Sequence, residues 1–145
     1  MREITEDEVQ KLEGCLQALA EYHNEVSRHF KGSYPNHSYE ITLNLFIASL
    51  EEKTSRIAVA EEKGNIIGFC KIDLHNEHGK IDYLVVKKEY RKKGYGKELM
   101  DWAMNSFDRC NVHRVEVKVV DGNEAIHLYE KYGFKINAHI LVNNR

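Results

Sequence analysis

The chain has 145 residues, enough for one domain with its own hydrophobic core. Hydrophobic residues make up 42% of it and charged residues 30%, a balance typical of globular proteins and not of disordered segments. A formal net charge of −2 argues against a general nucleic-acid binder, and the apolar runs are too short to cross a membrane.

The sequence shows no sign of a second domain or of export. It has one proline and no linker rich in Gly, Ser or Pro, so we predict a single domain over residues 1–145. The acidic start lacks the apolar segment that a secretory signal needs. The cysteines Cys15, Cys70 and Cys110 form no C-x-x-C pair, which suits reduced thiols, and we therefore expect a cytoplasmic protein.

The first third of the chain is predicted to be helical. From residue 6 to about residue 30, apolar positions recur at three- and four-residue steps, as on one face of an amphipathic helix. These positions are Val9, Leu12, Leu16, Leu19, His23 and Val26. A turn-like segment at residues 32–36 separates them from a second helical face, made of Leu43, Phe46, Ile47 and Leu50.

The pattern then changes to short strands. Residues 56–60 and 66–72 are rich in apolar and β-branched side chains, and the polar residues between them predict a hairpin. A polar turn at residues 75–79 leads into residues 81–86, which are apolar on nearly both faces. Such a strand is expected near the centre of its sheet.

The second half is predicted to alternate helices and strands. Gly96 opens a helix with Leu99, Ala103 and Phe107 on its inner face, and residues 114–120 form a strand. Asn123 is a plausible N-cap for a further helix, and Gly133 stands where a left-handed C-terminal residue belongs. A last strand is expected at residues 136–142. The order predicts an α/β (α+β) fold on one mostly antiparallel sheet, with a strand–helix–strand unit in its second half.

The segment from Arg91 to Lys97 has the features of a phosphate-binding turn. A buried strand runs into it, and Gly94 and Gly96 then open a helix whose free N–H groups and dipole favour an anion. Its cationic side chains are Arg91, Lys92, Lys93 and Lys97.

Two nucleotide-binding motifs fit this turn poorly. A P-loop needs Ser or Thr after Lys97, and a Rossmann fingerprint needs a third glycine where Leu99 stands. The alternative that stays open is a solvated basic turn before an ordinary helix.

Together with a second segment, this turn resembles the GNAT superfamily of N-acetyltransferases. The turn reads R-x-x-G-x-G, and residues 123–134 read N-x-A-x-x-L-Y-x-x-x-G-F. The resemblance covers roughly residues 56–142, whereas the N-terminal third matches only in being helical and lacks a clear opening strand. It implies a GNAT-like central, mixed sheet with helices on both faces.

The resemblance implies an acyltransferase that moves an acetyl group from acetyl-CoA, as cosubstrate, to an amine by direct attack in a ternary complex. No metal, nucleic acid or membrane is expected to take part, and the protein is expected to be a monomer or a homodimer. The acceptor, a small-molecule or peptide amine, stays open. The residues expected to bind the cofactor are Leu84, Val85, Val86, Arg91, Lys92, Lys93, Gly94, Tyr95, Gly96, Lys97 and Asn123.

Two residues are candidates for the proton transfers. Tyr129 would protonate the departing thiolate, although an aromatic side chain packed between helix and sheet is the alternative. Asp82 would be the general base, because an apolar setting between Ile81 and Tyr83 would raise its pKa. A solvent-facing carboxylate, with a water chain in place of a single base, is equally open.

Two other functions remain possible on the same residues. A non-catalytic acyl-CoA-binding sensor would share the fold and the cofactor turn. An RNA-binding domain would use the basic turn, but only Tyr90 and Tyr95 interleave with its charges, so base stacking is thin. The pair His75-x-x-His78 has no further partners at metal-site spacing.

Overall fold

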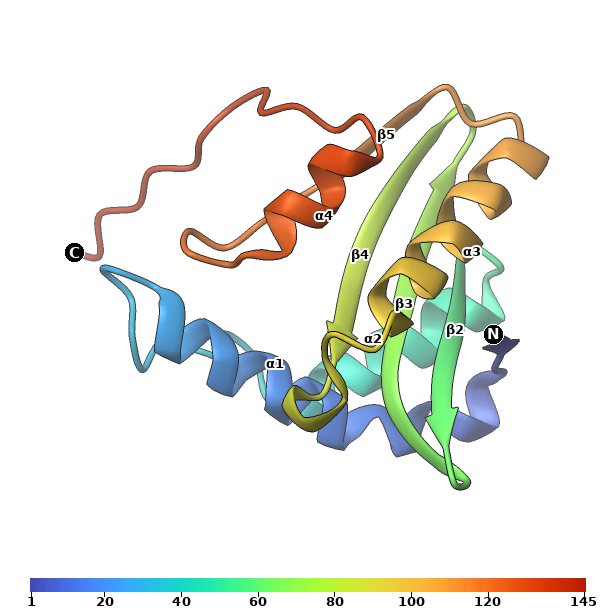
Figure 1. The fold of residues 1–145 in the computed structure, drawn as a ribbon, viewed down its shortest axis with the longest axis horizontal. Helices are drawn as coiled ribbons and strands as arrows, with labels where there is room; N and C mark the ends of the chain where they lie inside the picture. Colours follow the sequence, from blue (N-terminus) through green and yellow to red (C-terminus); the bar gives the residue numbers. More distant parts are fainter.

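The computed structural model describes residues 1–145 as a sheet packed between two layers of helices (Figure 1). The strands are β1 (Arg2–Glu3), β2 (Ser55–Glu62), β3 (Asn65–His75), β4 (His78–Val86) and β5 (Arg114–Val117). The helices are η1 (Glu6–Leu12), α1 (Glu13–Val26), α2 (Tyr39–Glu51), η2 (Lys88–Tyr90), α3 (Tyr95–Arg109) and α4 (Ala125–Lys131). The longest helix, α3, has 15 residues, and no helix is both long and apolar enough to cross a membrane.

The sheet is mixed and follows chain order, β1-β2-β3-β4-β5. Its first four strands pair antiparallel, and β5 joins β4 in parallel. The predicted hairpin is confirmed: Lys63 and Gly64 both have positive φ, 53° and 79°, as a two-residue hairpin turn requires. The opening strand β1 has only two residues, too few to produce an alternating pattern in the sequence.

Each face of the sheet carries its own core, which confirms the predicted fold class. Alternation along β3 sends Phe69 toward η1, α1 and α2, and Cys70 toward α3 and α4. Figure 1 shows α2 and α3 on opposite sides of the strands. On the α3 side, Gly79 leaves room for the buried ring of Phe107, because a Cβ at that glycine would lie 2.5 Å from the Phe107 Cε1 atom.

The first predicted helix begins as a 3₁₀-helix, η1, and ends earlier than expected, at Val26. Ser27 has extended backbone, with ψ 129°, and its hydroxyl accepts the Phe30 N–H at 3.1 Å. Asn24 holds the next turn, since its Oδ1 accepts the N–H groups of Gly32 and Tyr34 at 2.8 and 3.0 Å. These side-chain hydrogen bonds compete with continuation of the helix.

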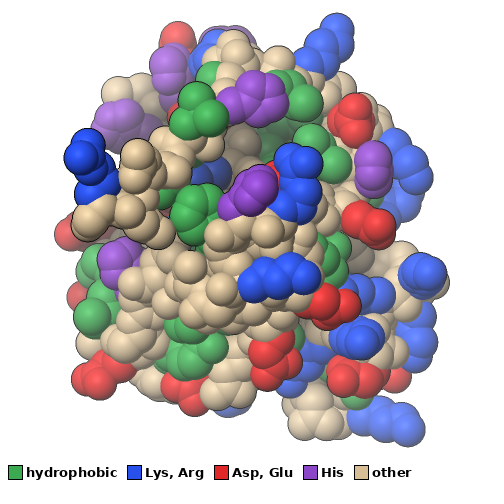
Figure 2. Space-filling model, turned by 90° about the vertical axis from the view of Figure 1, so that its left-hand side faces the viewer, with side chains coloured by type: hydrophobic (Ala, Val, Ile, Leu, Met, Phe, Trp, Pro, Cys, Tyr) green, Lys and Arg blue, Asp and Glu red, His purple; other side chains and the backbone are tan.

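The last two predicted strands differ from the structure. The strand expected at residues 114–120 ends at Val117, and residues 136–142 form no strand. Pairing with β4 stops where Val117 lies opposite Ile81, and β5 is the edge of the sheet, so no other strand pairs with the chain past Val117. The C-terminal segment leaves Ile136, Ile140 and Leu141 exposed. Figure 2 shows the side that carries this segment, where hydrophobic and histidine side chains lie at the surface.

Candidate active site

The most unusual feature of the sheet is an unpaired edge on β4. This strand pairs with β3 up to Val86, but with β5 only from His78 to Ile81. Residues 82–86 therefore have a strand on one side only, and their outward backbone groups, apart from the Val86 carbonyl that Arg91 binds, are available to a ligand. Leu84, Val85 and Val86, which the sequence predicted as backbone contacts to a cofactor arm, all lie on this free stretch.

Asp82 lies where the paired and unpaired parts of β4 meet. Lys71 pairs with Tyr83 and Ile72 with Ile81, so Asp82 is the extra residue of a β-bulge. Ile81 belongs to the core on the α3 side, whereas Tyr83 packs against the other core. The bulge thus changes which face the following side chains reach.

The setting of Asp82 is ionic, which its apolar sequence neighbours did not reveal. The Asp82 Oδ2 atom lies 2.8 Å from the Lys71 Nζ, and its Oδ1 lies 3.6 Å from the Lys80 Nζ. Lys71 is 4% exposed, binds Asp73 at 2.6 Å and lies 5.2 Å from the centre of the Phe46 ring. A buried ammonium group therefore holds this carboxylate in place.

The basic turn leads into a helix N-terminus without a cap. Lys92 and Gly94 have positive φ, 64° and 92°, and no side chain caps α3. The first N–H to find a helical acceptor is that of Glu98, 3.0 Å from the Gly94 carbonyl. The N–H groups of Tyr95, Gly96 and Lys97 are those that an α-helix leaves free at its start.

The cations of the turn divide into two groups. Lys92 and Lys93 are exposed at the start of α3. The Arg91 side chain turns back toward the sheet, where its Nε donates to the Val86 carbonyl at 2.9 Å. Lys97 pairs with Asp101 at 2.9 Å. The structure therefore gathers backbone donors and two exposed lysines at one point, with Arg91 anchoring the turn to β4.

Tyr129 lies on α4 with its ring packed into the α3-side core. It is 6% exposed, and its ring meets that of Phe134 edge-on, with centres 5.9 Å apart. Its hydroxyl has no hydrogen-bond partner in the protein, yet no fully buried side-chain polar atom lacks one, so the hydroxyl reaches an accessible space. Burial raises the pKa of Tyr129, which keeps the phenol protonated at neutral pH.

The segment before and after Tyr129 is fixed by local hydrogen bonds. The Asn123 Oδ1 accepts the Ala125 N–H at 2.9 Å, but the N-cap of α4 is Glu124, so Asn123 lies one residue before the cap position predicted for it. Gly133 has a φ of 89°, and the N–H of Phe134 bonds the Tyr129 carbonyl at 3.2 Å, as predicted for a left-handed helix end.

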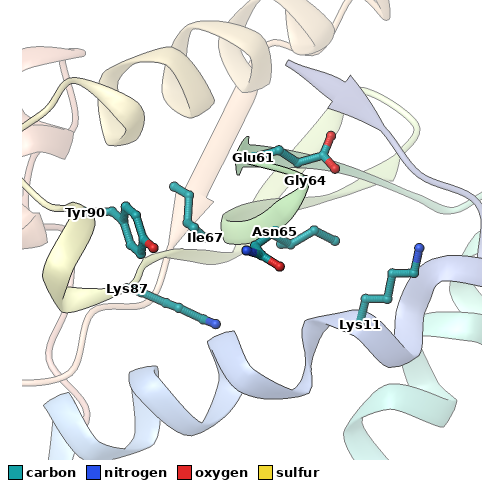
Figure 3. Close-up of a pocket in the computed structure, with 8 residues that line it drawn as sticks. Lys11, Glu61, Gly64, Asn65, Ile67, Lys87 and Tyr90 are labelled. Atoms are coloured by element: carbon teal, nitrogen blue, oxygen red, sulfur yellow. The ribbon is translucent and has the colours of Figure 1, made fainter.

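Two grooves flank the β4–η2 segment, and neither Tyr129 nor Asp82 lines them. One, of about 490 Å³, lies between the β2–β3 hairpin and the start of the helical layer, and Figure 3 shows Lys11 and Lys87 reaching into it from opposite sides. The other, of about 420 Å³, lies between α1 and Arg91. No group of three His, Cys, Asp or Glu side chains could hold a metal ion.

Comparison with known proteins identifies the family. The profile described as the Acetyltransferase (GNAT) family matches residues 15–134, which include β4, the basic turn and α4. The chain belongs to the GNAT family. The predicted family and the expected fold are thus both confirmed.

The amino-acid sequence is similar to those of two N-acetyltransferases. The chain is 27% identical over 112 residues to spermidine N(1)-acetyltransferase of Vibrio cholerae, covering 74% of this chain and 65% of that protein. It is 26% identical over 111 residues to a putative ribosomal protein bS18-alanine N-acetyltransferase of Bacillus subtilis, covering 69% of this chain and 74% of that protein. The chain thus spans less than two thirds of the first relative's length.

The structural similarity extends over nearly the whole chain. The PaiA N-acetyltransferase of Thermoplasma acidophilum, in complex with coenzyme A, superposes with a TM-score of 0.77 at 20% identity. The match covers 94% of this chain and 89% of that one. At this identity the similarity shows the shared fold.

Proposed function

We propose that the chain is an acetyl-CoA-dependent N-acetyltransferase that acts by direct attack of an amine within a ternary complex. One observation carries the proposal: the free edge of β4 is followed, after η2 and the basic turn, by the uncapped N-terminus of α3. An extended amide-containing arm fits the first feature, and a pyrophosphate fits the second. Coenzyme A joins these two groups in one molecule.

The proposed cofactor contacts follow this path. Backbone groups of Leu84, Val85 and Val86 bind the pantetheine arm, and Asn123 contacts the arm from the start of α4. The N–H groups of Tyr95, Gly96 and Lys97 bind the pyrophosphate, with Gly94 allowing its close approach. Lys92 and Lys93 add charge, and Arg91 fixes the turn.

The proposed reaction moves one acetyl group and two protons. The amine nitrogen forms a bond to the thioester carbon, while a backbone N–H of β4 stabilises the oxyanion. The C–S bond then breaks, and Tyr129 donates its proton to the thiolate. Asp82, or a water chain in its place, accepts the proton that the amine loses. The products are an amide and free coenzyme A.

The proposed acceptor is a small-molecule or peptide amine. The names of the two relatives give spermidine and an alanine of a ribosomal protein as their acceptors, which are amines of both kinds. We also propose one domain for residues 1–145, because both cores share one sheet, and a cytoplasmic location, because the cysteines are free.

Tyr129→Phe tests the proposed proton donor. The change keeps the packed ring and removes the hydroxyl, so the coenzyme affinity should hold while kcat falls about ten- to a thousand-fold, roughly 1.4–4 kcal/mol of transition-state stabilisation. Burial raises the pKa of Tyr129 above 10.0, the ordinary value for tyrosine. Loss of its proton should therefore cause no fall in the wild-type rate at any pH below 10.0. Steady-state kinetics across pH, with thiol release as readout, measure both.

Tyr132→Phe is the matched control for that variant. Tyr132 is the C-cap of α4 and its hydroxyl donates to Asp101 at 2.5 Å, so the rate should stay near that of the wild type. Coenzyme binding by the wild type without turnover of any polyamine, amino acid, aminoglycoside or peptide would instead favour a non-catalytic sensor.

Asp82→Asn tests the proposed base. The amide keeps the shape of the side chain but accepts no proton at neutral pH, so kcat/KM should fall about ten- to a thousand-fold and the acidic limb of the pH profile should change. Loss of melting temperature with near-normal turnover would show that Asp82 serves only to pair with Lys71.

A further inference from the structure

The last two turns of α1 contact both proposed cofactor-binding segments. The Arg91 guanidinium carbon lies 4.5 Å from the centre of the Tyr22 ring, and the Tyr22 hydroxyl accepts the backbone N–H of Glu124 at 3.2 Å. Because Arg91 also bonds the Val86 carbonyl, one tyrosine connects the free edge of β4 to the loop before α4. No strand pairing connects these two segments.

The neighbouring residue, His23, contacts the same loop through Asn123. The Asn123 Oδ1 is used by the Ala125 N–H, so its amide nitrogen faces His23 and donates to the Nε2 atom at 3.1 Å. That nitrogen must then be unprotonated. Burial lowers the pKa of His23, which favours the neutral ring that this hydrogen bond needs. The ring also meets Tyr34 edge-on, with centres 5.2 Å apart.

The backbone of the loop lies tightly against α1 at the same place. Gly122 has a φ of 94°, and a Cβ on it would lie 2.3 Å from the Val26 carbonyl oxygen. An exposed ion pair between Arg28 and Asp121, at 2.9 Å, extends the contact. In Figure 1 the end of α1 runs beneath the loop that leads to α4.

We propose that Tyr22 and His23 are positioning residues that hold the two cofactor-binding segments at the separation coenzyme A requires. The inference rests on the proposed function. Sheet hydrogen bonds fix the distance between β4 and β5 only up to Ile81 and Val117. Beyond that point side chains connect the two arms: Tyr132 bonds Asp101 and the Lys97 carbonyl on the α3 side, and Tyr22 and His23 form the connection on the α1 side. A site already held at the right width loses less conformational entropy when it binds, and its affinity is higher.

Two pairs of variants test this role. Tyr22→Leu removes both contacts, whereas Tyr22→Phe keeps the ring over Arg91. His23→Leu removes the acceptor for Asn123, whereas His23→Gln supplies an amide oxygen in its place. Coenzyme A affinity is measured by isothermal titration calorimetry, and kcat and KM for acetyl-CoA are measured with the best amine. His127→Leu, at a side chain 74% exposed on α4, is the control.

The leucine variants should raise the coenzyme A Kd roughly ten-fold, while kcat at saturation changes less than about two-fold. The conservative variants should recover most of the affinity, and the control should match the wild type. Circular dichroism establishes that each variant is folded.

Three results would overturn the inference. Unchanged Kd in all four variants would show that α1 does not set the site. A fall in kcat with normal Kd would make these residues part of the chemistry, and equal losses in the leucine and conservative variants would point to helix packing. If the wild type itself fails to bind coenzyme A, the proposed function falls and the inference with it.

Discussion

The β2–β3–β4 meander and the β4–β5 edge are built in opposite ways. In the meander, ladder pairs run from Ser55 opposite Asp73 to Gly68 opposite Val86, with side chains buried on both faces. At the edge, four residue pairs join β4 to β5, and the segments beyond them are held by side chains of α1. We therefore expect the meander to supply most of the free energy of unfolding. At the edge, we expect the distance between β4 and the segment after β5 to vary more easily.

This difference explains why the candidate site lies at the edge. A fully paired strand has no backbone group left for a ligand, whereas residues 82–86 keep one free side. The same incomplete pairing would leave the site loose if nothing else connected its two arms. The following changes separate the two regions, from the largest expected effect to the smallest.

The largest expected effect is the loss of stability when a cavity is made in the core that covers the meander. Phe107 is 1% exposed and packs over Gly79 on β4, so Phe107→Ala should lower the free energy of unfolding by about 3–5 kcal/mol. Urea denaturation measures the loss. Coenzyme A affinity, measured where the variant is still folded, should change little. A loss below about 1 kcal/mol would mean that this core carries little of the stability.

A matched pair of glycines should separate backbone strain from the α1 contact. Gly122 and Gly64 both have positive φ, 94° and 79°, so alanine at either should cost about 1–2 kcal/mol. Only Gly122 also has the Val26 carbonyl in the way, while nothing lies within 4 Å of a Cβ on Gly64. Gly122→Ala should therefore lose additional stability and hydrogen-exchange protection at Ala125, and Gly64→Ala should not. Equal losses would contradict a tight contact at α1.

The smallest effect should be a pH dependence that arises at the edge. Burial lowers the folded-state pKa of His23 below its ordinary value of 6.5, so the unfolded chain binds the proton more readily. The free energy of unfolding should fall as the pH drops through 6.5 and level off below the folded-state pKa. Urea titrations from neutral to acidic pH measure this slope. It should be shallower in His23→Gln, and an identical slope would show that His23 contributes nothing to it.

Local rules were enough to place the turn before α3 and the end of α4. Gly94 and Gly133 both take left-handed conformations at helix ends, which the absence of a side chain makes easy and which the sequence therefore reveals. The apolar stripe of α3 was equally readable, since Leu99, Ala103 and Phe107 are buried.

Features that depend on register or distant partners were not predictable. The Lys71–Asp82 pair forms because a bulge brings two strands together in one particular register, and no periodicity in either strand records it. His23 fits the apolar face of its helix, yet its partner Asn123 lies in a loop far along the chain. The missing strands at residues 118–120 and 136–142 are apolar enough to be strands, but the structure gives them no neighbour.

The bulge at Asp82 shifts, by one residue, the alternation of side chains between the two faces of the sheet along β4. Before it, Ile81 reaches the α3-side core, and after it Leu84 and Val86 reach the same core, while Val85 reaches the other. Without the extra residue, alternation would put Ile81 and Val85 on one face. A one-residue deletion here would therefore exchange the inner and outer surfaces of half a strand. Insertions and deletions at this point should be far more damaging than any single substitution.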